Sequence, residues 1–387
     1  MSDAPAARGD LAARLDNVID RALASQRVVG TATVVAHQGV VVYERFAGWA
    51  DREARIPVTA GQLFRLASMT KPIVAAAALA LVDRGELALS TPVHTILPHF
   101  RPRLSDGSSP EITIWQLLTH TSGLGYGFLS PDNEPFRGAG VSDGSDDSPV
   151  SLHDNVRRLA SIPLAFPPGT AWGYSLGIDV IGEVLQVVGG RSLPEMVTQL
   201  VTEPLKMTDT AFSAAEPDRL TAAYADAATP GAPARRMGVT DQLTMPFGGP
   251  IRYAPARAAD PSAYPSGGMG MVGTARDYLA LLEAVRTGGG PVLSAESARL
   301  MCTDAVAGHT VHVGPGTGFG VGFSVVRDQA EAESIRPTGS YGWGGVYGTN
   351  SFVDPAAAIS VVALTNTALE GLFGSYVNEV EAAVYSD

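Results

Sequence analysis

Strand-like segments lie at both ends of the chain, with mostly helical or irregular segments between them. β-Branched runs at 28–36 and 40–46, separated by His37-Gln38-Gly39, predict a hairpin near the start. Later strands are expected at 319–326, 346–353 and 359–365. Helical spacing precedes the first hairpin and follows the last strand, so both ends can pack on one sheet. We therefore expect an α+β fold with an antiparallel sheet built from both termini, flanked by helices.

The middle of the chain is then an insertion into this sheet. We expect residues 1–88 and 290–387 to form an α/β lobe and residues 89–289 a mostly helical lobe, with the active site in the cleft between them. The segment 126–149 is rich in Gly, Pro, Ser and Asp. Such a segment is typical of a lid or binding loop, and surface disorder is the alternative.

The composition limits the partners that this chain can bind. Its net charge is -12 and only 17% of its 387 residues are charged, without basic patches. Nucleic acid and anionic membranes are therefore not expected partners, whereas small neutral substrates are. Cys302 is the single cysteine, so the chain cannot form an intrachain disulfide. We expect Cys302 to be a buried apolar residue.

The start of the chain bears on location. The segment 1–10 is polar and lacks the basic start and apolar core of a secretion signal, which favours a cytoplasmic protein. No apolar stretch is long enough to span a bilayer. The sequence leaves the oligomeric state open.

A serine and a lysine three residues apart give the main chemical signal. Ser68 and Lys71 open a helical pattern that runs to Gly85, so their side chains share one helix face. A serine hydroxyl is a weak nucleophile unless a neighbour accepts its proton, and a lysine kept neutral by burial can accept it. Because this spacing is also common on solvated helix faces, it makes Ser68 a candidate nucleophile and no more.

Two other serines, Ser142 and Ser175, stand in the pattern G-x-S-x-G. That pattern marks a nucleophile when a strand precedes it and a helix follows it. A loop rich in Pro and Gly precedes Ser175, and no regular pattern flanks Ser142, so we expect neither to be the nucleophile. His309 and His312 follow where an α/β-hydrolase would need a histidine, but nothing separates them from ordinary surface histidines.

The remaining motifs point away from metals and cofactors. No acidic residue lies at a sequence spacing from His120 that would indicate a catalytic pair. We therefore interpret His120 as a residue that stabilises a turn. The sequence contains no H-E-x-x-H, no paired cysteines, no His-rich spacing and no G-x-x-x-x-G-K phosphate loop. We therefore expect no cofactor and no metal in the reaction.

Several segments together resemble a known family. Ser68-Met69-Thr70-Lys71 matches the S-x-x-K of the serine hydrolases with the β-lactamase and penicillin-binding-protein fold, and Tyr174, at a loop-to-helix junction, matches their tyrosine. Trp343-Gly344-Gly345 stands where β-lactamases have K-T-G. Within this group the chain is most similar to family VIII carboxylesterases, which are related to class C β-lactamases. The stretches 117–124 and 268–277 also look like the family.

The resemblance implies roles for the matched residues. Ser68 would attack the acyl carbon, while Lys71 and Tyr174 would act as a coupled pair that takes its proton, protonates the leaving alcohol and activates the deacylating water. The backbone N–H groups of Ser68 and Val346 would form the oxyanion hole.

The resemblance also implies a substrate-binding wall. Gly344 and Gly345 would let backbone and substrate approach closely, and Trp343 would line the pocket. Tyr126, in the loop at 126–149, is a second candidate for that wall.

Two departures from the family pattern indicate the substrate. Trp343 replaces the lysine of K-T-G, and Leu176 stands where class C enzymes commonly have an asparagine two residues after the tyrosine. Both changes remove groups that would hold a charged peptide or β-lactam, and an apolar wall favours neutral esters. We predict a carboxylesterase for short-chain acyl esters with at most weak β-lactamase activity. The alternatives are an acyltransferase using the same acyl-enzyme, a β-lactamase, D,D-peptidase or amide hydrolase, and a non-catalytic ligand-binding protein.

Overall fold

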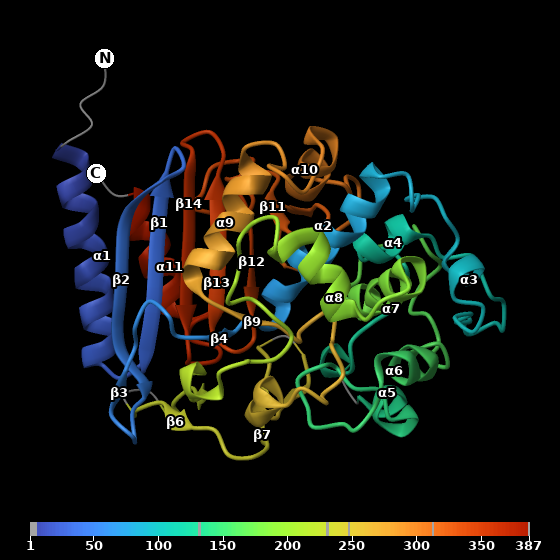
Figure 1. The fold of residues 1–387 in the computed structure, drawn as a ribbon, viewed down its shortest axis with the longest axis horizontal. Helices are drawn as coiled ribbons and strands as arrows, with labels where there is room; N and C mark the ends of the chain where they lie inside the picture. Colours follow the sequence, from blue (N-terminus) through green and yellow to red (C-terminus); the bar gives the residue numbers. More distant parts are fainter. Residues whose placement is uncertain (1–5, 131–132, 230–231, 247, 312, 386–387) are drawn as a thin grey trace.

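An eight-stranded antiparallel sheet organises the computed structural model of this chain (Figure 1). The structure describes residues 6–130, 133–229, 232–246, 248–311 and 313–385. The strand order is β10-β11-β12-β13-β14-β1-β2-β3. The strands are β1 Gly30–His37, β2 Val40–Asp51, β3 Ile56–Pro57, β10 Thr317–Phe319, β11 Ser324–Val326, β12 Tyr341–Gly345, β13 Thr349–Asp354 and β14 Ile359–Thr365.

The two ends of the chain meet in the middle of this sheet. β1 pairs with β14 over its length, from Thr31 opposite Thr365 to His37 opposite Ile359. Both strands are buried almost throughout, because successive side chains point to opposite faces of the sheet and helices cover both faces. The predicted α+β fold, with one antiparallel sheet from both termini, is confirmed.

The first hairpin turns where the sequence predicted it. Gln38 and Gly39 both have positive φ, 52° and 81°, between β1 and β2. Two successive residues with positive φ match the twist of the flanking strands, and glycine has no steric cost there. His37, the last residue of β1, is half-buried.

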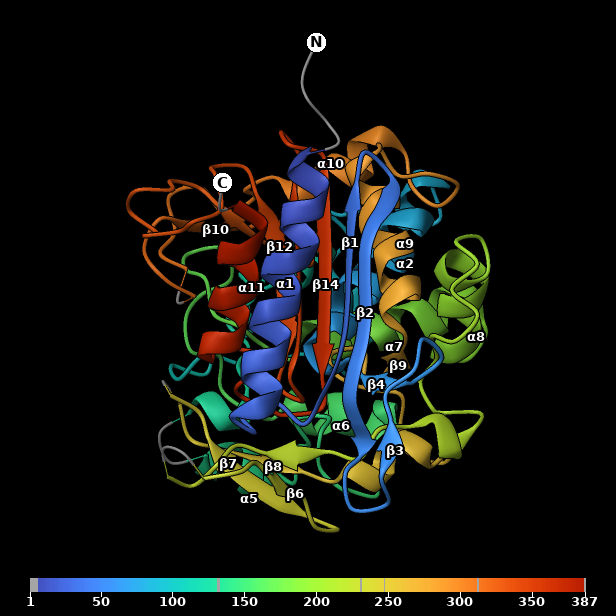
Figure 2. The ribbon, with the colours of Figure 1, turned by 90° about the vertical axis from the view of Figure 1, so that its left-hand side faces the viewer.

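Helices cover both faces of the sheet (Figure 2). The outer face carries α1 (Ala6–Ala24) and α11 (Ser375–Tyr385), whose apolar residues, among them Leu15, Ile19 and Tyr376, pack on Val35 and Phe352. The inner face carries α2 (Thr70–Asp83), α9 (Ala275–Arg286) and α10 (Ala295–Cys302). Because α2 is almost wholly apolar and Ala-rich, it is buried on all sides between the sheet and the helices of the middle segment.

The middle of the chain supplies the remaining elements. Its helices are α3 Val93–Ile96, α4 Ile114–Leu118, α5 Glu134–Ala139, α6 Leu152–Leu159, α7 Gly177–Gly189 and α8 Leu193–Val197, and a π-helical turn, Thr198–Thr202, extends α8. The middle of the chain also forms two short hairpins, β5 Tyr224–Ala225 with β6 Arg235–Arg236 and β7 Asp241–Thr244 with β8 Pro250–Tyr253. β4 (Phe64–Arg65) pairs with β9 (Val272–Gly273).

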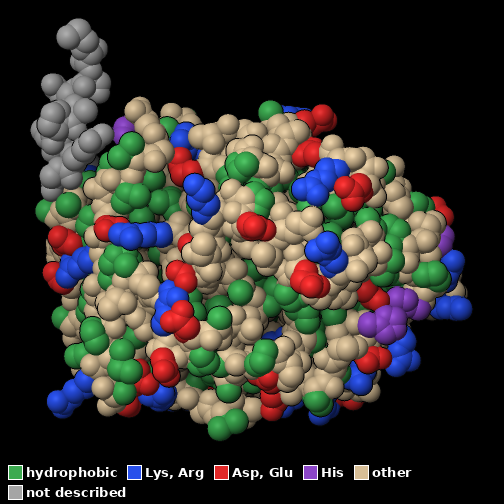
Figure 3. Space-filling view, in the orientation of Figure 1, with side chains coloured by type: hydrophobic (Ala, Val, Ile, Leu, Met, Phe, Trp, Pro, Cys, Tyr) green, Lys and Arg blue, Asp and Glu red, His purple; other side chains and the backbone are tan. Residues whose placement is uncertain are grey.

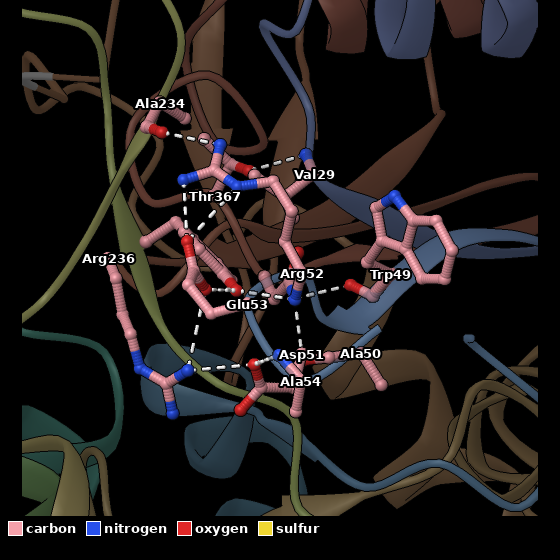
Figure 4. A network of polar contacts seen from close by, with 12 residues as sticks. Val29, Trp49, Ala50, Asp51, Arg52, Glu53, Ala54, Ala234, Arg236 and Thr367 are labelled. Atoms are coloured by element: carbon pink, nitrogen blue, oxygen red, sulfur yellow. Dashed lines mark hydrogen bonds and ion pairs between the residues drawn. The ribbon is translucent and has the colours of Figure 1, made fainter. Parts of the chain in front are cut away.

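A network of polar contacts ties the hairpin β5–β6 to the end of β2 (Figure 4). Arg236 forms an ion pair with Asp51 at 2.7 Å, and the Arg52 guanidinium donates to the carbonyl of Ala234 at 2.8 Å. The N–H of Arg52 donates to the Tyr224 hydroxyl at 2.8 Å. The middle segment is therefore attached to the sheet through side chains as well as through its chain connections.

Two predicted strand boundaries were wrong. The expected strand at 319–326 is a tight hairpin, β10 and β11, whose turn includes Gly322 at a φ of +100°. The expected strand at 346–353 begins only at Thr349, because Gly348, at a φ of +97°, turns the chain between β12 and β13. Val346 therefore lies in a turn, directly after the strand that carries Trp343.

Among the described residues, no helix is both long and apolar enough to cross a membrane. The sequence analysis used residues 1–10 to argue against a secretion signal. Residues 1–5 of that segment lie outside the described residues.

Candidate active site

Ser68 lies on a short 3-10 turn, Ala67–Met69, that leads directly into α2. Its side chain is nearly buried, with 4% of the residue exposed. Ala67 has a positive φ of 47°, a conformation that costs energy for a residue with a Cβ. Such strain is characteristic of functional turns, and here it sets the direction in which the chain enters the turn that carries Ser68.

Lys71 lies one turn further on and is completely buried. Its Nζ lies 3.3 Å from Ser68 Oγ and donates to the carbonyl of Gly268 at 2.9 Å. Burial lowers the pKa of Lys71 to about 7, although the negative charges of Asp179 and Asp143 oppose this shift. A large fraction of Lys71 is therefore neutral near neutral pH, which a proton acceptor for Ser68 requires.

Tyr174 lies against the same lysine, just before α7 begins at Gly177. Lys71 Nζ is 4.6 Å from the centroid of the Tyr174 ring. Burial raises the pKa of Tyr174, and the nearby Ser68 and Trp343 offset part of that rise. The structure thus brings Tyr174, which is distant in the sequence, to the neighbouring pair Ser68 and Lys71.

Ser175, the next residue, faces a different partner. It is fully buried, and its Oγ lies 3.0 Å from His120 Nδ1 and accepts from the N–H of Gly177 at 3.3 Å. Burial holds the pKa of His120 well below its usual value, so the imidazole is neutral. A serine with no exposed surface cannot reach a substrate, and this pair fixes the turn before α7, as expected for His120.

The remaining candidates from the sequence were Ser142, His309 and His312. Ser142 is buried in a turn, where its hydroxyl donates to Asp146 at 2.6 Å and accepts from the N–H of Gly144 at 3.1 Å. The backbone N–H of His309 closes a turn with Val306 at 3.0 Å. His312 lies outside the described residues.

β12 passes alongside the turn that carries Ser68. A Cβ added at Gly345 would lie 2.2 Å from the carbonyl of Leu66 and 3.1 Å from Ala67, so only glycine permits this approach. Val346 follows directly, and its carbonyl accepts from the Tyr253 hydroxyl at 3.1 Å. The close contact holds the end of β12 next to Ser68.

Trp343 of β12 belongs to an aromatic cluster at the site. Its ring centroid is 5.3 Å from that of Tyr174 and 5.2 Å from that of Phe319. The residue is only half-buried. An aromatic side chain of this kind presents an apolar surface beside Tyr174. Gly344, the residue after it, packs on Leu372, which a Cβ at Gly344 would approach to 2.4 Å.

Tyr126 is fully buried, although the sequence placed it in a loop. Its ring centroid is 5.2 Å from that of Tyr174 and 5.1 Å from Lys71 Nζ. Asp143, from the same segment, accepts from the N–H groups of Gly127 and Phe128 at 2.9 and 3.2 Å. Within the described part of 126–149, Tyr126 therefore packs against Lys71, and Asp143 holds the turn that follows it.

Asp179 and Gly268 are functional candidates that the sequence did not reveal. Asp179 is buried in the first turn of α7, where its Oδ1 accepts from Ser266 at 2.8 Å. Burial raises its pKa to about 6, against the opposing effects of Ser266 and Lys71. A Cβ at Gly268 would meet Asp179 Oδ2 at 2.6 Å and the Tyr126 hydroxyl at 2.7 Å. An acidic residue in a first helical turn is ordinary, so no sequence signal marks Asp179.

Four buried polar atoms around Lys71 have no partner at hydrogen-bonding geometry: Tyr126 OH, Tyr174 OH, Asp179 Oδ2 and Trp343 Nε1. Buried polar atoms are nearly always paired, so such a concentration in one place needs an explanation. A substrate would supply partners to Tyr174 and Trp343, which are half-buried, whereas Tyr126 and Asp179 are fully buried.

No metal ligation is evident at this site. Among the described residues, the group of His, Cys, Asp and Glu side chains close enough to hold a metal ion is His99, His153 and Glu183, and it includes none of the residues around Ser68. The reactive groups at the candidate active site are a hydroxyl, an amine and a phenol.

Comparison with known proteins assigns the class. The family model described as Beta-lactamase matches residues 15–385, and the chain belongs to this family. The family resemblance predicted from Ser68, Lys71, Tyr174 and the segment 343–345 is therefore confirmed.

Particular relatives are similar over almost the whole chain. Esterase EstB of Burkholderia gladioli is 48% identical over 378 residues, which cover 97% of this chain and 95% of that protein. The structure of EstCE1, a hydrolase with promiscuous acyltransferase activity, has a TM-score of 0.95 and 42% identity, and the match covers 98% of this chain and all of EstCE1. Simvastatin synthase (LovD) from Aspergillus terreus has a TM-score of 0.76 at 22% identity, with 97% and 98% covered, and shares the fold.

Proposed function

We propose that this protein is a serine carboxylesterase that hydrolyses short-chain, neutral acyl esters through an acyl-enzyme on Ser68. The observation that carries the proposal is the fully buried Lys71, whose Nζ lies 3.3 Å from Ser68 Oγ and whose pKa is about 7. The 48% identity to Esterase EstB supports the same chemistry.

In the first step Ser68 Oγ attacks the ester carbonyl carbon, and its proton passes to the Lys71–Tyr174 pair. The pair returns a proton to the alkoxide, so the alcohol leaves and the acyl group stays on Ser68. In the second step water adds to the acyl carbon, loses a proton to the same pair, and the carboxylic acid leaves while Ser68 regains its proton. Because the lysine and the tyrosine are in contact, they titrate as one unit.

The oxyanion of each tetrahedral intermediate would accept from the N–H groups of Ser68 and Val346. The close approach of Gly345 to the carbonyl of Leu66 supports this assignment, because it brings the end of β12 to the turn that carries Ser68. Backbone donors aimed at the developing charge need no rearrangement during the reaction.

The acyl or alcohol part of the substrate would lie against Trp343. Gly344 and Gly345 would act on the same strand by letting β12 pack closely on Leu372 and on the Leu66 carbonyl. Trp343 is half-buried beside Tyr174, and no charge is present at its position to hold a substrate carboxylate. Weak or absent β-lactamase activity follows from this. Tyr126 is buried against Lys71 and would limit the inner end of the pocket.

We also propose that the chain divides into two lobes. These are an α/β lobe, 1–88 with 290–387, and a mostly helical lobe, 89–289. Lys71, at the start of α2, donates to Gly268 and lies beside Tyr174, both from the middle of the chain. Contacts of this kind support an active site between the two lobes.

The test is hydrolysis of short-chain nitrophenyl esters and of a chromogenic cephalosporin by the parent, Ser68→Ala and Ser175→Ala. We expect ester hydrolysis by the parent, its loss in Ser68→Ala, and little turnover of the cephalosporin. Ser175→Ala is the matched control, because it removes a buried hydroxyl from the other serine motif. Esterase activity that survives in Ser68→Ala and disappears in Ser175→Ala would overturn the assignment.

Acyl transfer to an alcohol is the second candidate function. EstCE1 has promiscuous acyltransferase activity and shares 42% identity with this chain. An apolar wall at Trp343 would bind an acceptor alcohol near the acyl-enzyme. Product analysis with an added primary alcohol separates the two reactions: a new ester that increases with alcohol concentration indicates transfer, and the free acid alone indicates hydrolysis.

A further inference from the structure

We propose that His99, His153 and Glu183 form a binding site for one divalent transition-metal ion of the zinc class. The three side chains come from three segments of the middle of the chain: His99 follows α3, His153 lies on α6 and Glu183 lies on α7. Histidine side chains gather on the right-hand side of the molecule, near α3 and α6 (Figure 3).

The ligand atoms are already close together. His153 Nδ1 lies 2.6 Å and His99 Nε2 lies 3.4 Å from Glu183 Oε1, and the three ligand atoms all fall within 4.8 Å of one another. Bond lengths of about 2.0–2.2 Å put neighbouring ligands of a tetrahedral zinc ion roughly 3.3 Å apart. Small side-chain rotations therefore suffice for all three groups to bind one ion.

The chemistry of the group suits zinc. Two imidazole nitrogens and one carboxylate oxygen form a common zinc ligand set, and water takes the fourth position. Imidazole also binds copper, nickel and cobalt, whereas magnesium and calcium prefer oxygen ligands only. The site is thus selective for the nitrogen-binding divalent metals.

An unpartnered carboxylate oxygen points to a missing ligand. Glu183 Oε2 is buried without a hydrogen-bond partner, and the Glu183 side chain is only 4% exposed; His99 Nε2 makes no hydrogen bond, and its contact with Glu183 Oε1 is the ion-pair distance of 3.4 Å. A buried carboxylate that lacks full pairing is costly, and a cation bound to it removes that cost. The His153 side chain is 57% exposed, so an ion can enter from solvent.

Bound metal would cross-link α6, α7 and the segment after α3. Glu183 lies one helical turn beyond Asp179 on α7, so the ion would hold the helix that also carries a residue beside Lys71. The ion's expected role is structural. No sequence motif marks the site, because its ligands come from separate elements; His153 and Glu183, for example, are 30 residues apart.

The test uses untagged, full-length protein stripped with a chelator and then titrated with Zn²⁺ by calorimetry. We expect one Zn²⁺ per chain with micromolar or tighter affinity, and a melting temperature that rises by roughly 3 °C at saturating metal. Co²⁺ in place of zinc should give the intense visible absorption of a tetrahedral site.

The key variant is His153→Ala, because the exposed position of this side chain leaves folding intact. It should lose the stoichiometric binding, the thermal shift and the Co²⁺ spectrum, and the near-isosteric Glu183→Gln should weaken all three. His94→Ala is the matched control, since His94 lies 3.8 Å from Glu111 in another His–Glu pair and should keep them. No saturable binding by the parent, or equal binding by the parent and His153→Ala, would overturn the proposal.

Discussion

At the scale of the residue, the proposed chemistry depends on the burial of Lys71. A lysine with an ordinary pKa is protonated at neutral pH and cannot accept a proton from serine. Here the surrounding apolar core, the rings of Tyr126 and Tyr174 and the opposing charge of Asp179 together determine its protonation. Residues that are not adjacent in sequence thus set the protonation of the proposed base.

Removal of either member of the proposed base pair should abolish most turnover. Lys71→Met and Tyr174→Phe each keep the volume of the side chain, so we expect folding to persist while kcat falls by about 10²–10⁴-fold. Steady-state kinetics with a nitrophenyl ester measures the loss, and thermal unfolding checks the fold. Wild-type kcat in both variants would contradict the coupled-base mechanism.

The pH dependence should reveal Asp179 as a positioning residue. Neutral Lys71 becomes more abundant as pH rises, so kcat/KM should increase with pH around a midpoint near 7. The carboxylate of Asp179 raises the pKa of Lys71, so Asp179→Asn should move this midpoint to lower pH by about one unit.

The matched control for that profile is Asp154→Asn, which removes an exposed carboxylate at the start of α6. Its midpoint should equal that of the parent. A merely structural role for Asp179 would lower kcat without moving the midpoint, and that result would refute the electrostatic role.

At the scale of the element, β12 and the turn before α2 act as one unit. The carbonyl of Leu66 accepts from Thr349 Oγ1 at 3.1 Å, and Gly345 lies directly against the same carbonyl. The segment after Gly268 is held in a similar way, because the N–H of Met271 donates to Thr70 Oγ1 at 3.1 Å. The positions of Ser68 and Val346 relative to each other follow from these contacts between elements.

Gly345→Ala should therefore separate β12 from Ser68. The added Cβ would lie 2.2 Å from the Leu66 carbonyl, so the strand must move, and we expect kcat to fall at least about 10²-fold as oxyanion donors are displaced. Esterase kinetics and thermal unfolding measure the effect. Gly61→Ala is the control, because its nearest atoms are on Arg219 at 3.5 Å or more. Equal activity of both variants would show that this approach is not needed.

At the scale of the whole molecule, the two ends of the chain stabilise each other. The Tyr376 hydroxyl of α11 lies 2.9 Å from Thr31 Oγ1 and 3.2 Å from Thr33 Oγ1 of β1, in the apolar layer between the terminal helices and the sheet. This layer covers the face of the sheet opposite to α2. Stability and catalysis are therefore separable in space.

Tyr376→Phe should lower stability without changing the chemistry. The substitution leaves the buried hydroxyls of Thr31 and Thr33 with fewer partners, which should cost about 1–2 kcal/mol of the free energy of unfolding. Urea or thermal unfolding measures the loss, and kcat should stay within about twofold of the parent. A large fall in kcat with unchanged stability would contradict this separation of the two faces.

Much of the architecture could be predicted from local patterns. The runs around His37-Gln38-Gly39 and the run of β14 are short, rich in β-branched residues and bounded by turn residues, which favours strands, and the helical spacing at both termini was also visible. The predicted start of the strand near Val346 was wrong. It depends on a turn at Gly348, and no local sequence pattern predicts the positive φ of that residue. Short elements of the middle segment, such as β5 to β8, are formed by tertiary contacts and have little pattern of their own.

The sequence by itself determined the fold class, because strand and helix periods are local patterns. It also determined the family and the candidate nucleophile, because Ser68, Lys71, Tyr174 and the segment 343–345 together match one family pattern. Only the tertiary structure decided the environment of these groups. Asp179 and Gly268 reach Lys71 from distant segments, Tyr126 proves to be buried, and Glu183 meets two histidines from other elements. The physical reason is that pKa values and ligand geometry depend on burial and on distances between segments, which no local sequence pattern contains.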